Sequence, residues 1–276
     1  MYESFFGFST KPFSKTPDPR FLYLSKTHEE ALARLHYAVE EREIVVLTGE
    51  VGSGKTTITR SLMDSLGEAY RIILILNPRL TSLDLVKTIC ARLQCGGQLS
   101  HKSDLLDAIY AKLYEDHTSG ITPVVIIDEA HLIPYRETFE EIRLLTNFQM
   151  DDVNLLSLIL VGQPDLRKKL ELPLLRALRQ RIGIFCHLGA IGEDEMKCYI
   201  EYRTSVGGRE KPLFTDAAIQ TIYTFSKGIP RVINSLASMT LLEGFSQDAD
   251  MIDESMVCAA AKEIGLNGYC ENKKKN

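Results

Sequence analysis

The eight residues from Gly49 to Thr56 read GEVGSGKT, and this glycine-rich segment constrains the fold more than any other feature of the chain. A short β-branched run, 44–47, precedes it, and apolar residues recur behind it at Ile58, Leu62 and Leu66 with helical spacing. A strand, a glycine loop and a helix in this order are the setting in which such a segment surrounds phosphate groups. Glycines let successive backbone N–H groups curl around an anion, and the helix N-terminus adds a partial positive charge. The chain is therefore predicted to bind ATP or GTP.

Each part of this loop has an expected task. We expect Lys55 to reach the β- and γ-phosphates and Thr56 to ligate Mg²⁺. The residues expected to bind the nucleotide are Gly49, Glu50, Val51, Gly52, Ser53, Gly54, Lys55, Thr56 and Thr57. The guanine-specific pattern Asn/Thr-Lys-x-Asp does not occur in the sequence, which favours ATP over GTP.

A second motif, residues 124–129, reads VVIIDE and places two acids at the end of an expected strand. Ligands of open α/β sheets bind at the carboxyl ends of the strands. We expect Asp128 to hold Mg²⁺ through its ligand shell and Glu129 to orient and polarise the attacking water. Taken alone, the motif would be better explained as a strand that ends in a polar turn. Downstream of a glycine loop, it favours ATP hydrolysis over mere binding.

The composition is that of an ordinary globular protein, with 45% hydrophobic and 25% charged residues. At 276 residues we expect one large domain and a small one. The six cysteines are scattered without a C-x-x-C pair, so neither a zinc site nor a disulfide framework is indicated. We expect a cytoplasmic protein, because the sequence has no signal-peptide pattern and no apolar run as long as a membrane span, about 18 residues. The net charge of −5 does not by itself indicate a nucleic-acid binder.

Apolar runs alternate with helical patterns over the first two thirds of the chain. The expected strands beyond the first are 72–76, 123–127, 155–161 and 182–188, and the helices among them include 83–93 and 103–114. This alternation predicts an α/β fold with a parallel five-stranded sheet flanked by helices. Only helices are expected after Gly192, at 194–206, 215–226, 230–245 and 253–264. The predicted domains are a strap and first helix within the nucleotide domain (1–42), the nucleotide-binding core (43–190), a small all-helical lid (191–266) and a disordered basic tail (267–276).

Four segments together resemble an AAA+ P-loop ATPase, namely Gly49–Thr56, Asp128–His131, Val161–Pro164 and Gly228–Arg231. The chain is more closely similar to the ExeA/GspA-type branch, which is related to the transposition ATPases of the TniB, TnsC and IstB types. Its opening, residues 2–24, looks like the N-terminal signature of that branch. ExeA-type secretion proteins continue into a transmembrane helix and a periplasmic peptidoglycan-binding region. The printed sequence ends without either, so we expect no direct membrane insertion.

The resemblance also implies roles for residues outside the two motifs. Gln163 stands at the position of the polar residue that senses the γ-phosphate, and Arg231 at that of the arginine that reaches the nucleotide from the lid. One of Arg176, Arg179 and Arg181 is expected to act as an arginine finger on a neighbouring subunit's ATP, with Arg179 and Arg181 preferred. The alternative is that these arginines form ordinary surface ion pairs. Two histidines near the motifs, His28 and His131, are expected to be structural or coupling residues rather than bases.

An arginine supplied by a neighbour implies a homo-oligomeric ring or filament. The first hypothesis is a DNA-associated regulator that assembles on double-stranded DNA and recruits a transposase-like partner. Its DNA contacts would be Arg79, Lys87, His101 and Lys102, which could equally form a solvated helix face. The second hypothesis is an assembly ATPase of a secretion or pilus machine, which acts on protein partners. The third is a nucleotide switch that does not polymerise.

Overall fold

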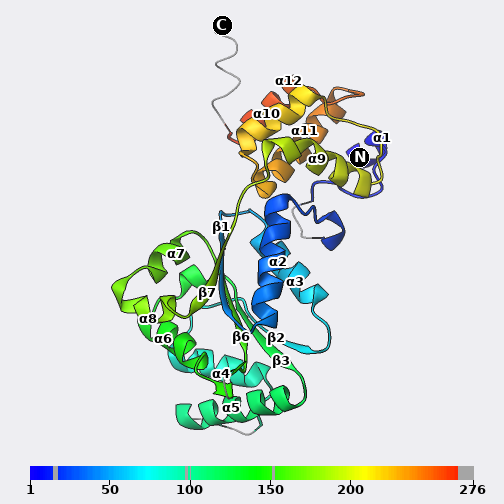
Figure 1. Ribbon diagram of the computed structural model, residues 1–276. Helices are drawn as coiled ribbons and strands as arrows, with labels where there is room; N and C mark the ends of the chain where they lie inside the picture. Colours follow the sequence, from blue (N-terminus) through cyan, green and yellow to red (C-terminus); the bar gives the residue numbers. More distant parts are fainter. Residues whose placement is uncertain (15–17, 97–98, 100, 151–152, 267–276) are drawn as a thin grey trace. The chain divides into compact units, whose positions relative to one another are not determined.

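The computed structural model describes residues 1–14, 18–96, 99, 101–150 and 153–266, and the expected basic tail lies outside them. The chain divides into two compact units (Figure 1). The sheet unit holds residues 30–51 and 58–188, and the helical unit holds residues 1–29, 52–57 and the chain from Gly189 onward. The division passes through two helices, α2 (Lys26–Glu40) and α3 (Lys55–Ser65).

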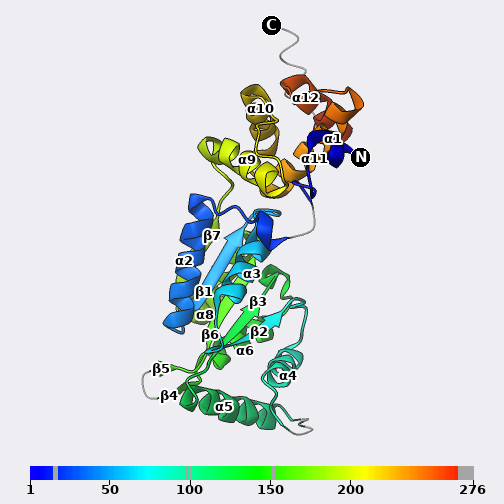
Figure 2. The ribbon, with the colours of Figure 1, turned by 90° about the vertical axis from the view of Figure 1, so that its right-hand side faces the viewer.

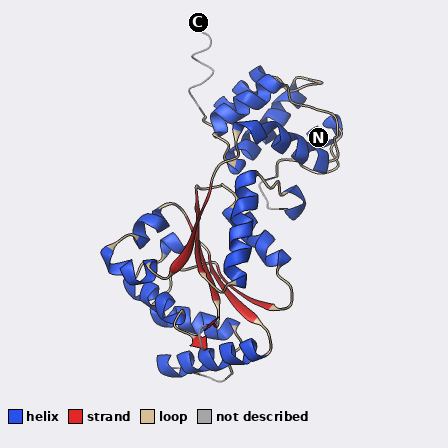
Figure 3. Ribbon diagram, viewed as in Figure 1, coloured by secondary structure: helices blue, strands red, loops and turns tan. Residues whose placement is uncertain are grey.

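The sheet unit contains a parallel five-stranded sheet (Figure 3). Its strands are β1 (Ile44–Gly49), β2 (Tyr70–Ile75), β3 (Thr122–Ile127), β6 (Ser157–Gly162) and β7 (Ile182–Leu188), in the order β2-β3-β6-β1-β7. Every pair of neighbours is parallel. A separate antiparallel pair is formed by β4 (Gln149–Met150) and β5 (Val153–Asn154). The predicted five-stranded parallel sheet is confirmed.

The burial of each strand follows its place in the sheet. Every residue of the three central strands, β1, β3 and β6, is buried, whereas both edge strands, β2 and β7, carry partly exposed residues. Strands covered on both faces need continuous apolar runs, which is the pattern seen in the sequence. The expected strand at 155–161 begins only at Ser157, because Leu155 pairs its N–H with the Phe148 carbonyl instead.

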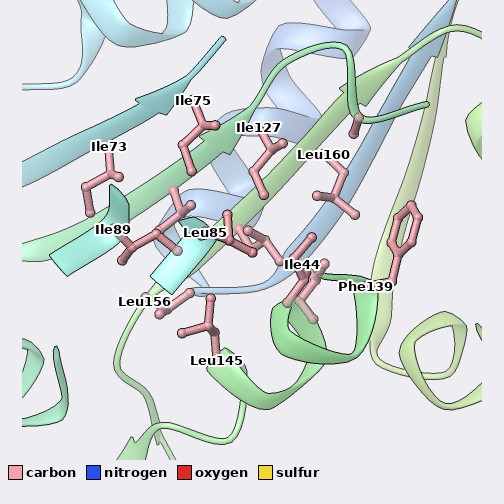
Figure 4. Packing of buried hydrophobic residues seen from close by; sticks show 14 of the residues in the cluster. Ile44, Ile73, Ile75, Leu85, Ile89, Ile127, Phe139, Leu145, Leu156 and Leu160 are labelled. Carbon is pink, nitrogen blue, oxygen red and sulfur yellow. The ribbon is translucent and has the colours of Figure 1, made fainter. Parts of the chain in front are cut away.

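Helices cover both faces of this sheet (Figures 1 and 2). They are α2 and α3 on one face and, toward the other, α4 (Ser82–Arg92), α5 (Lys102–Thr118), α6 (Arg136–Leu145), α7 (Asp165–Leu170) and α8 (Arg176–Arg179). Two short 3₁₀ helices lie among them, Ala130–Leu132 and Pro173–Leu175. Figure 4 shows how alternate strand residues such as Ile73, Ile75 and Ile127 meet Leu85 and Ile89 of α4.

The helical unit is built from α1 (Tyr2–Phe6), α9 (Met196–Val206), α10 (Asp216–Ser226), α11 (Pro230–Ser246) and α12 (Glu254–Glu263), with 3₁₀ turns at Pro19–Phe21 and Glu193–Glu195. Its four larger helices agree closely with the predicted ranges. Thr215 and Asp253 accept hydrogen bonds from the backbone at the starts of α10 and α12, which is the expected chemistry of a helix N-cap.

The N-terminal segment differs from the prediction. Residues 1–29 belong to the helical unit, whereas the sequence had assigned 1–42 to the nucleotide domain. The physical reason is a second apolar core, in which Phe6, Phe8 and Phe13 are buried among the residues of the C-terminal helices. The buried Arg203 of α9 also donates to the carbonyls of Pro12 (2.8 Å) and Phe21 (3.1 Å).

Among the helices of the described residues, none combines the length and the apolar character that crossing a membrane requires.

Candidate nucleotide-binding site

The glycine loop connects the end of β1 to the start of α3. Gly49 closes the strand, and Lys55 is the first residue of the helix. Gly52 and Gly54 have φ angles of +84° and +101°, which residues with a Cβ rarely adopt. The motif therefore folds here as a tight loop directly before a helix N-terminus, the geometry that binds anions.

Arg231 lies against this loop within the helical unit. Its backbone N–H donates to the Gly52 carbonyl at 3.3 Å, at the start of α11. A Cβ on Gly52 would lie 2.5 Å from the Arg231 Cβ, so only glycine fits beneath this arginine. The preceding turn also requires glycine, because Gly228 has a φ of +75° and a Cβ there would lie 2.0 Å from the Ile191 carbonyl oxygen. The Gly-Ile-Pro-Arg segment is thus shaped to bring Arg231 to the glycine loop.

His28 contacts the same loop from the first turns of α2. Its Nε2 lies 3.2 Å from the Ser53 carbonyl oxygen, and its Nδ1 lies 2.6 Å from Ser25 Oγ. Because a carbonyl only accepts hydrogen bonds, Nε2 carries the proton and Nδ1 of the neutral ring accepts from the Ser25 hydroxyl. Burial lowers the pKa of His28, while the hydrogen bond to Ser53 and the charge of Glu195 act in the opposite direction. Burial therefore favours this neutral form.

The loop has donors available for a polyphosphate. Within the described residues, the backbone N–H groups of Gly52, Ser53 and Gly54 have no hydrogen-bond partner, and the Ser53 hydroxyl is buried without one. A buried polar group such as the Ser53 hydroxyl is rarely left unpaired, so this hydroxyl, together with the N–H groups beside it, fits an anion bound in the loop. Lys55 is buried, whereas Thr56 is exposed at the helix N-terminus. The residues present therefore fit the triphosphate of a nucleotide.

The two acids lie at the end of β3 in the sheet unit. Asp128 is buried and its Oδ1 accepts the Glu129 N–H at 2.8 Å. Glu129 has a left-handed backbone (φ 52°, ψ 33°) and a side chain that is 42% exposed. A glutamate held at positive φ is strained, and such strain is typical of functional positions. Asp128 is thereby fixed in place, while the Glu129 carboxylate faces solvent.

His131 connects the second acid to the neighbouring strand. Its Nδ1 accepts the Gln163 N–H at 3.3 Å and lies 3.4 Å from Glu129 Oε2. Since a backbone N–H only donates, Nδ1 of the neutral ring is occupied as an acceptor and does not donate to the carboxylate. Lys169 donates to the His131 carbonyl at 2.8 Å, which also holds the turn. The structure thus places the backbone of Gln163, the expected γ-phosphate sensor, beside His131, whose ring lies next to Glu129.

The three candidate finger arginines differ in their surroundings. The Arg179 guanidinium lies over the Phe185 ring, 4.0 Å from its centre, and Arg181 donates to the Thr146 hydroxyl at 3.1 Å. Arg176 is exposed, and its side chain forms no hydrogen bond or ion pair within the described residues. The two arginines preferred from the sequence therefore contact other residues of this chain, and among the three candidates Arg176 is the one whose guanidinium has no partner within the described residues.

The residues expected to contact DNA all lie in the sheet unit. Arg79, Lys87 and His101 are exposed, which suits both DNA contact and a solvated surface. Lys102 instead forms an ion pair with the buried carboxylate of Glu141 on α6. One member of the expected basic strip is thus committed to holding α5 against α6.

The predicted site residues divide between the two units. The helical unit brings together Gly52, Ser53, Gly54, Lys55, Thr56, Thr57 and Arg231, and the sheet unit holds Gly49, Glu50, Val51, Asp128, Glu129 and Gln163. No three His, Cys, Asp or Glu side chains in the described ranges are grouped so that they could hold a metal alone. This is compatible with Mg²⁺ that keeps several waters and is held through one carboxylate and the substrate phosphates. Sequence reasoning missed the contact of His28 with the loop, for which the only signal was its place three residues after Ser25 at a helix start.

Comparison with known proteins gives a family match and a curated relative. Residues 38–170 match the protein family described as AAA domain. General secretion pathway protein A of Aeromonas hydrophila is 41% identical over 271 residues, which are 96% of this chain and 48% of that protein. The chain thus spans about half the length of the curated relative it matches.

Solved structures share the fold. CDC6P of Pyrobaculum aerophilum has a TM-score of 0.68 at 16% identity and covers 93% of this chain and 73% of its own. The RuvB Holliday junction branch migration motor of Thermotoga maritima has a TM-score of 0.59 at 22% identity, with 90% and 74% covered. Identities this low show the fold alone. The predicted fold class, a P-loop α/β domain followed by a small helical domain, is confirmed.

Proposed function

We propose that this chain, whose residues 38–170 match the AAA domain family, binds Mg-ATP and hydrolyses it to ADP and phosphate. The observation that carries the proposal is the glycine loop before the N-terminus of α3. In the part of the chain that the structure describes, its backbone N–H groups at residues 52–54 and the buried Ser53 hydroxyl have no partner.

Each site residue has a task in this proposal. Lys55 neutralises the β- and γ-phosphates, and Thr56 and Asp128 hold Mg²⁺. The ion, when bound, stabilises the charge that develops on the transferred phosphoryl group. Glu129 orients the attacking water and takes its proton, a task that suits a solvent-facing carboxylate. Gln163 and Arg231 contact the γ-phosphate or the water.

We further propose that the chain self-associates and that an arginine of one subunit acts on the ATP of the next. Arg176 is the preferred finger, because a guanidinium that must reach another subunit cannot be used for contacts inside its own. Arg179 and Arg181 remain candidates, and each would first have to leave Phe185 or Thr146.

The biological process is proposed from the curated relative. That relative is named as a protein of the general secretion pathway, which supports the second hypothesis, an assembly ATPase that acts on protein partners of a secretion machine. The first hypothesis, a transposition regulator that binds double-stranded DNA, receives no support from the family or from the relative. The pairing of Lys102 with Glu141 also weakens its basic strip.

The hydrolysis proposal is tested by measuring Mg²⁺-dependent phosphate release over a range of protein concentrations. We expect turnover that rises more than linearly with concentration, since the finger comes from a second subunit. Mixing inactive Arg176→Ala protein with inactive Lys55→Ala protein should restore part of the turnover. Turnover per subunit that is independent of concentration would contradict the shared site.

The secretion role is tested with a chimera in which this chain replaces the matching half of the Aeromonas hydrophila protein. We expect the chimera to support secretion in a strain that lacks the original protein, and the same chimera with Lys55→Ala to fail. A chimera that accumulates normally and supports no secretion would contradict this role. Tight, salt-sensitive binding to random duplex DNA in the presence of a non-hydrolysable ATP analogue would instead support the DNA hypothesis.

A further inference from the structure

A glycine loop binds phosphate only when its backbone N–H groups face inward, which turns the carbonyl groups outward. An outward carbonyl in a folded protein needs a donor, because an unpaired buried carbonyl is costly. Two successive carbonyls of this loop have donors from distant parts of the chain. The Gly52 carbonyl accepts the Arg231 N–H at 3.3 Å, and the Ser53 carbonyl accepts the ring N–H of His28 at 3.2 Å.

These two hydrogen bonds determine where the next N–H groups point. A trans peptide unit is rigid and planar, with its C=O and the following N–H directed to opposite sides. Because the Ser53 carbonyl points toward His28, the Gly54 N–H points away from it. For the same reason the Ser53 N–H points away from the Arg231 backbone. Both N–H groups have no partner within the described residues, so they are free to bind an anion.

The inference rests on the proposed binding of nucleotide by this loop. We propose that His28 is a positioning residue for phosphate recognition, whose ring N–H holds the Ser53–Gly54 peptide so that the Gly54 N–H faces the phosphates. His28 touches no phosphate itself in this arrangement; it acts through the Ser53 carbonyl.

The surroundings of His28 are built for this task. Ser25 is fully buried, and its hydroxyl lies 2.6 Å from Nδ1, which orients the ring and leaves Nε2 as the donor. His28 is itself 3% exposed, so water cannot replace it easily as the partner of the Ser53 carbonyl. The other donor, the Arg231 backbone, is not removed by a side-chain substitution. His28 is therefore the point at which the loop orientation can be tested by mutation.

The test compares His28→Leu, which removes the donor, with His28→Gln, whose side-chain amide can still donate. The dissociation constants of Mg-ATP and Mg-ADP are measured by titration with each full-length protein, and the melting temperature is recorded without nucleotide. We expect His28→Leu to weaken both nucleotides by about 5- to 100-fold, because the loop then holds the binding orientation only part of the time. His28→Gln should recover most of the affinity.

His36→Leu is the matched control. His36 lies on the same helix, and its Nε2 bonds Ser65 Oγ at 3.0 Å in an exposed position. We expect His36→Leu to bind both nucleotides like the unmodified protein. If His28→Leu does not fold, Ser25→Ala takes its place, since it leaves the ring donor present but no longer oriented; we expect affinity weaker by about 2- to 10-fold.

Three outcomes separate the inference from the function it rests on. Unchanged affinity in His28→Leu, or in Ser25→Ala if that variant is used, overturns the inference. So does a His28→Gln protein as weak as His28→Leu at an unchanged melting temperature. In both cases, binding that still requires Lys55 leaves the proposed function standing. An unmodified protein that binds no nucleotide overturns the proposed function itself.

Discussion

The glycine loop and the acidic end of β3 are held in place by different means. The loop carbonyls are paired with His28 and Arg231, which are far from the loop and from each other in the sequence. The acidic end is held by contacts within the sheet unit: Asp128 accepts the Glu129 N–H, and His131, which lies beside Glu129, accepts the Gln163 N–H. The loop carbonyls should therefore respond to changes at His28 and around Arg231 in the helical unit, while the acids should respond to changes within the sheet unit.

The difference also separates binding from hydrolysis. The loop contributes backbone donors whose direction depends on outside support, so its failure would lower nucleotide affinity. The acids contribute side chains at the end of a buried strand, so their failure would lower the rate of hydrolysis with less effect on affinity. Four substitutions test this separation.

Glu129→Gln should give the largest effect. Removing the base should lower the hydrolysis rate by about 10²- to 10⁴-fold, with Mg-ATP affinity nearly unchanged. Single-turnover phosphate release and equilibrium titration measure the two quantities. Glu137→Gln, an exposed glutamate in the first turn of α6, serves as the control. A loss of Mg-ATP affinity as large as the loss of hydrolysis rate would show that binding and hydrolysis are not separated between the two regions.

Lys55→Ala should lower Mg-ATP affinity by about 100-fold or more, because a buried charged partner of the phosphates is lost. Arg60→Ala provides a comparison on the exposed face of the same helix, and we expect it to bind normally. Affinity is read by titration with a fluorescent ATP analogue. Retained affinity in Lys55→Ala would refute the role of the loop in phosphate binding.

Gly52→Ala tests the dependence of the loop on Arg231. The alanine would have to adopt the φ of +84° that Gly52 has, which residues with a Cβ rarely do. Its Cβ would also lie 2.5 Å from the Arg231 Cβ, so the loop or α11 must move. We expect nucleotide affinity to fall by about tenfold, with a strain of about 1–3 kcal/mol. Gly67→Ala is the control, since nothing lies within 4 Å of its added Cβ. Equal affinities in the two variants would show that the contact does not constrain the loop.

His131→Ala should give the smallest effect. It removes the acceptor of the Gln163 N–H and the ring beside Glu129, so we expect the hydrolysis rate to fall by about two- to tenfold at nearly constant affinity. Steady-state measurements of kcat and KM distinguish an effect on the hydrolysis rate from an effect on nucleotide binding. His101→Ala changes an exposed histidine of the same unit and should leave both values unaltered. A change confined to KM would instead tie His131 to nucleotide binding.

The sheet could be predicted from the sequence because its strands are continuous apolar runs. Strands covered on both faces leave that pattern directly in the chain, and motif spacing placed Asp128 at a strand end. Helix α6 was not predicted, since six of its ten residues are polar or charged and hide the repeat of the apolar Phe139, Ile142 and Leu145. The association of residues 1–29 with the C-terminal helices was also missed, because aromatic residues indicate burial without naming their partner.

The sequence by itself predicted the class of fold, which the structure confirms, and the phosphate-binding chemistry that we propose for the glycine loop. Both rest on local patterns: a glycine spacing that few other loops require, and apolar runs of strand length. Only the tertiary structure decided which groups support the loop and which arginine is free. His28 and Arg231 acquire this property from partners far away in the chain, and Arg176 from the lack of a side-chain partner among the residues that the structure describes. Such pairings follow from packing between elements, which no local pattern encodes.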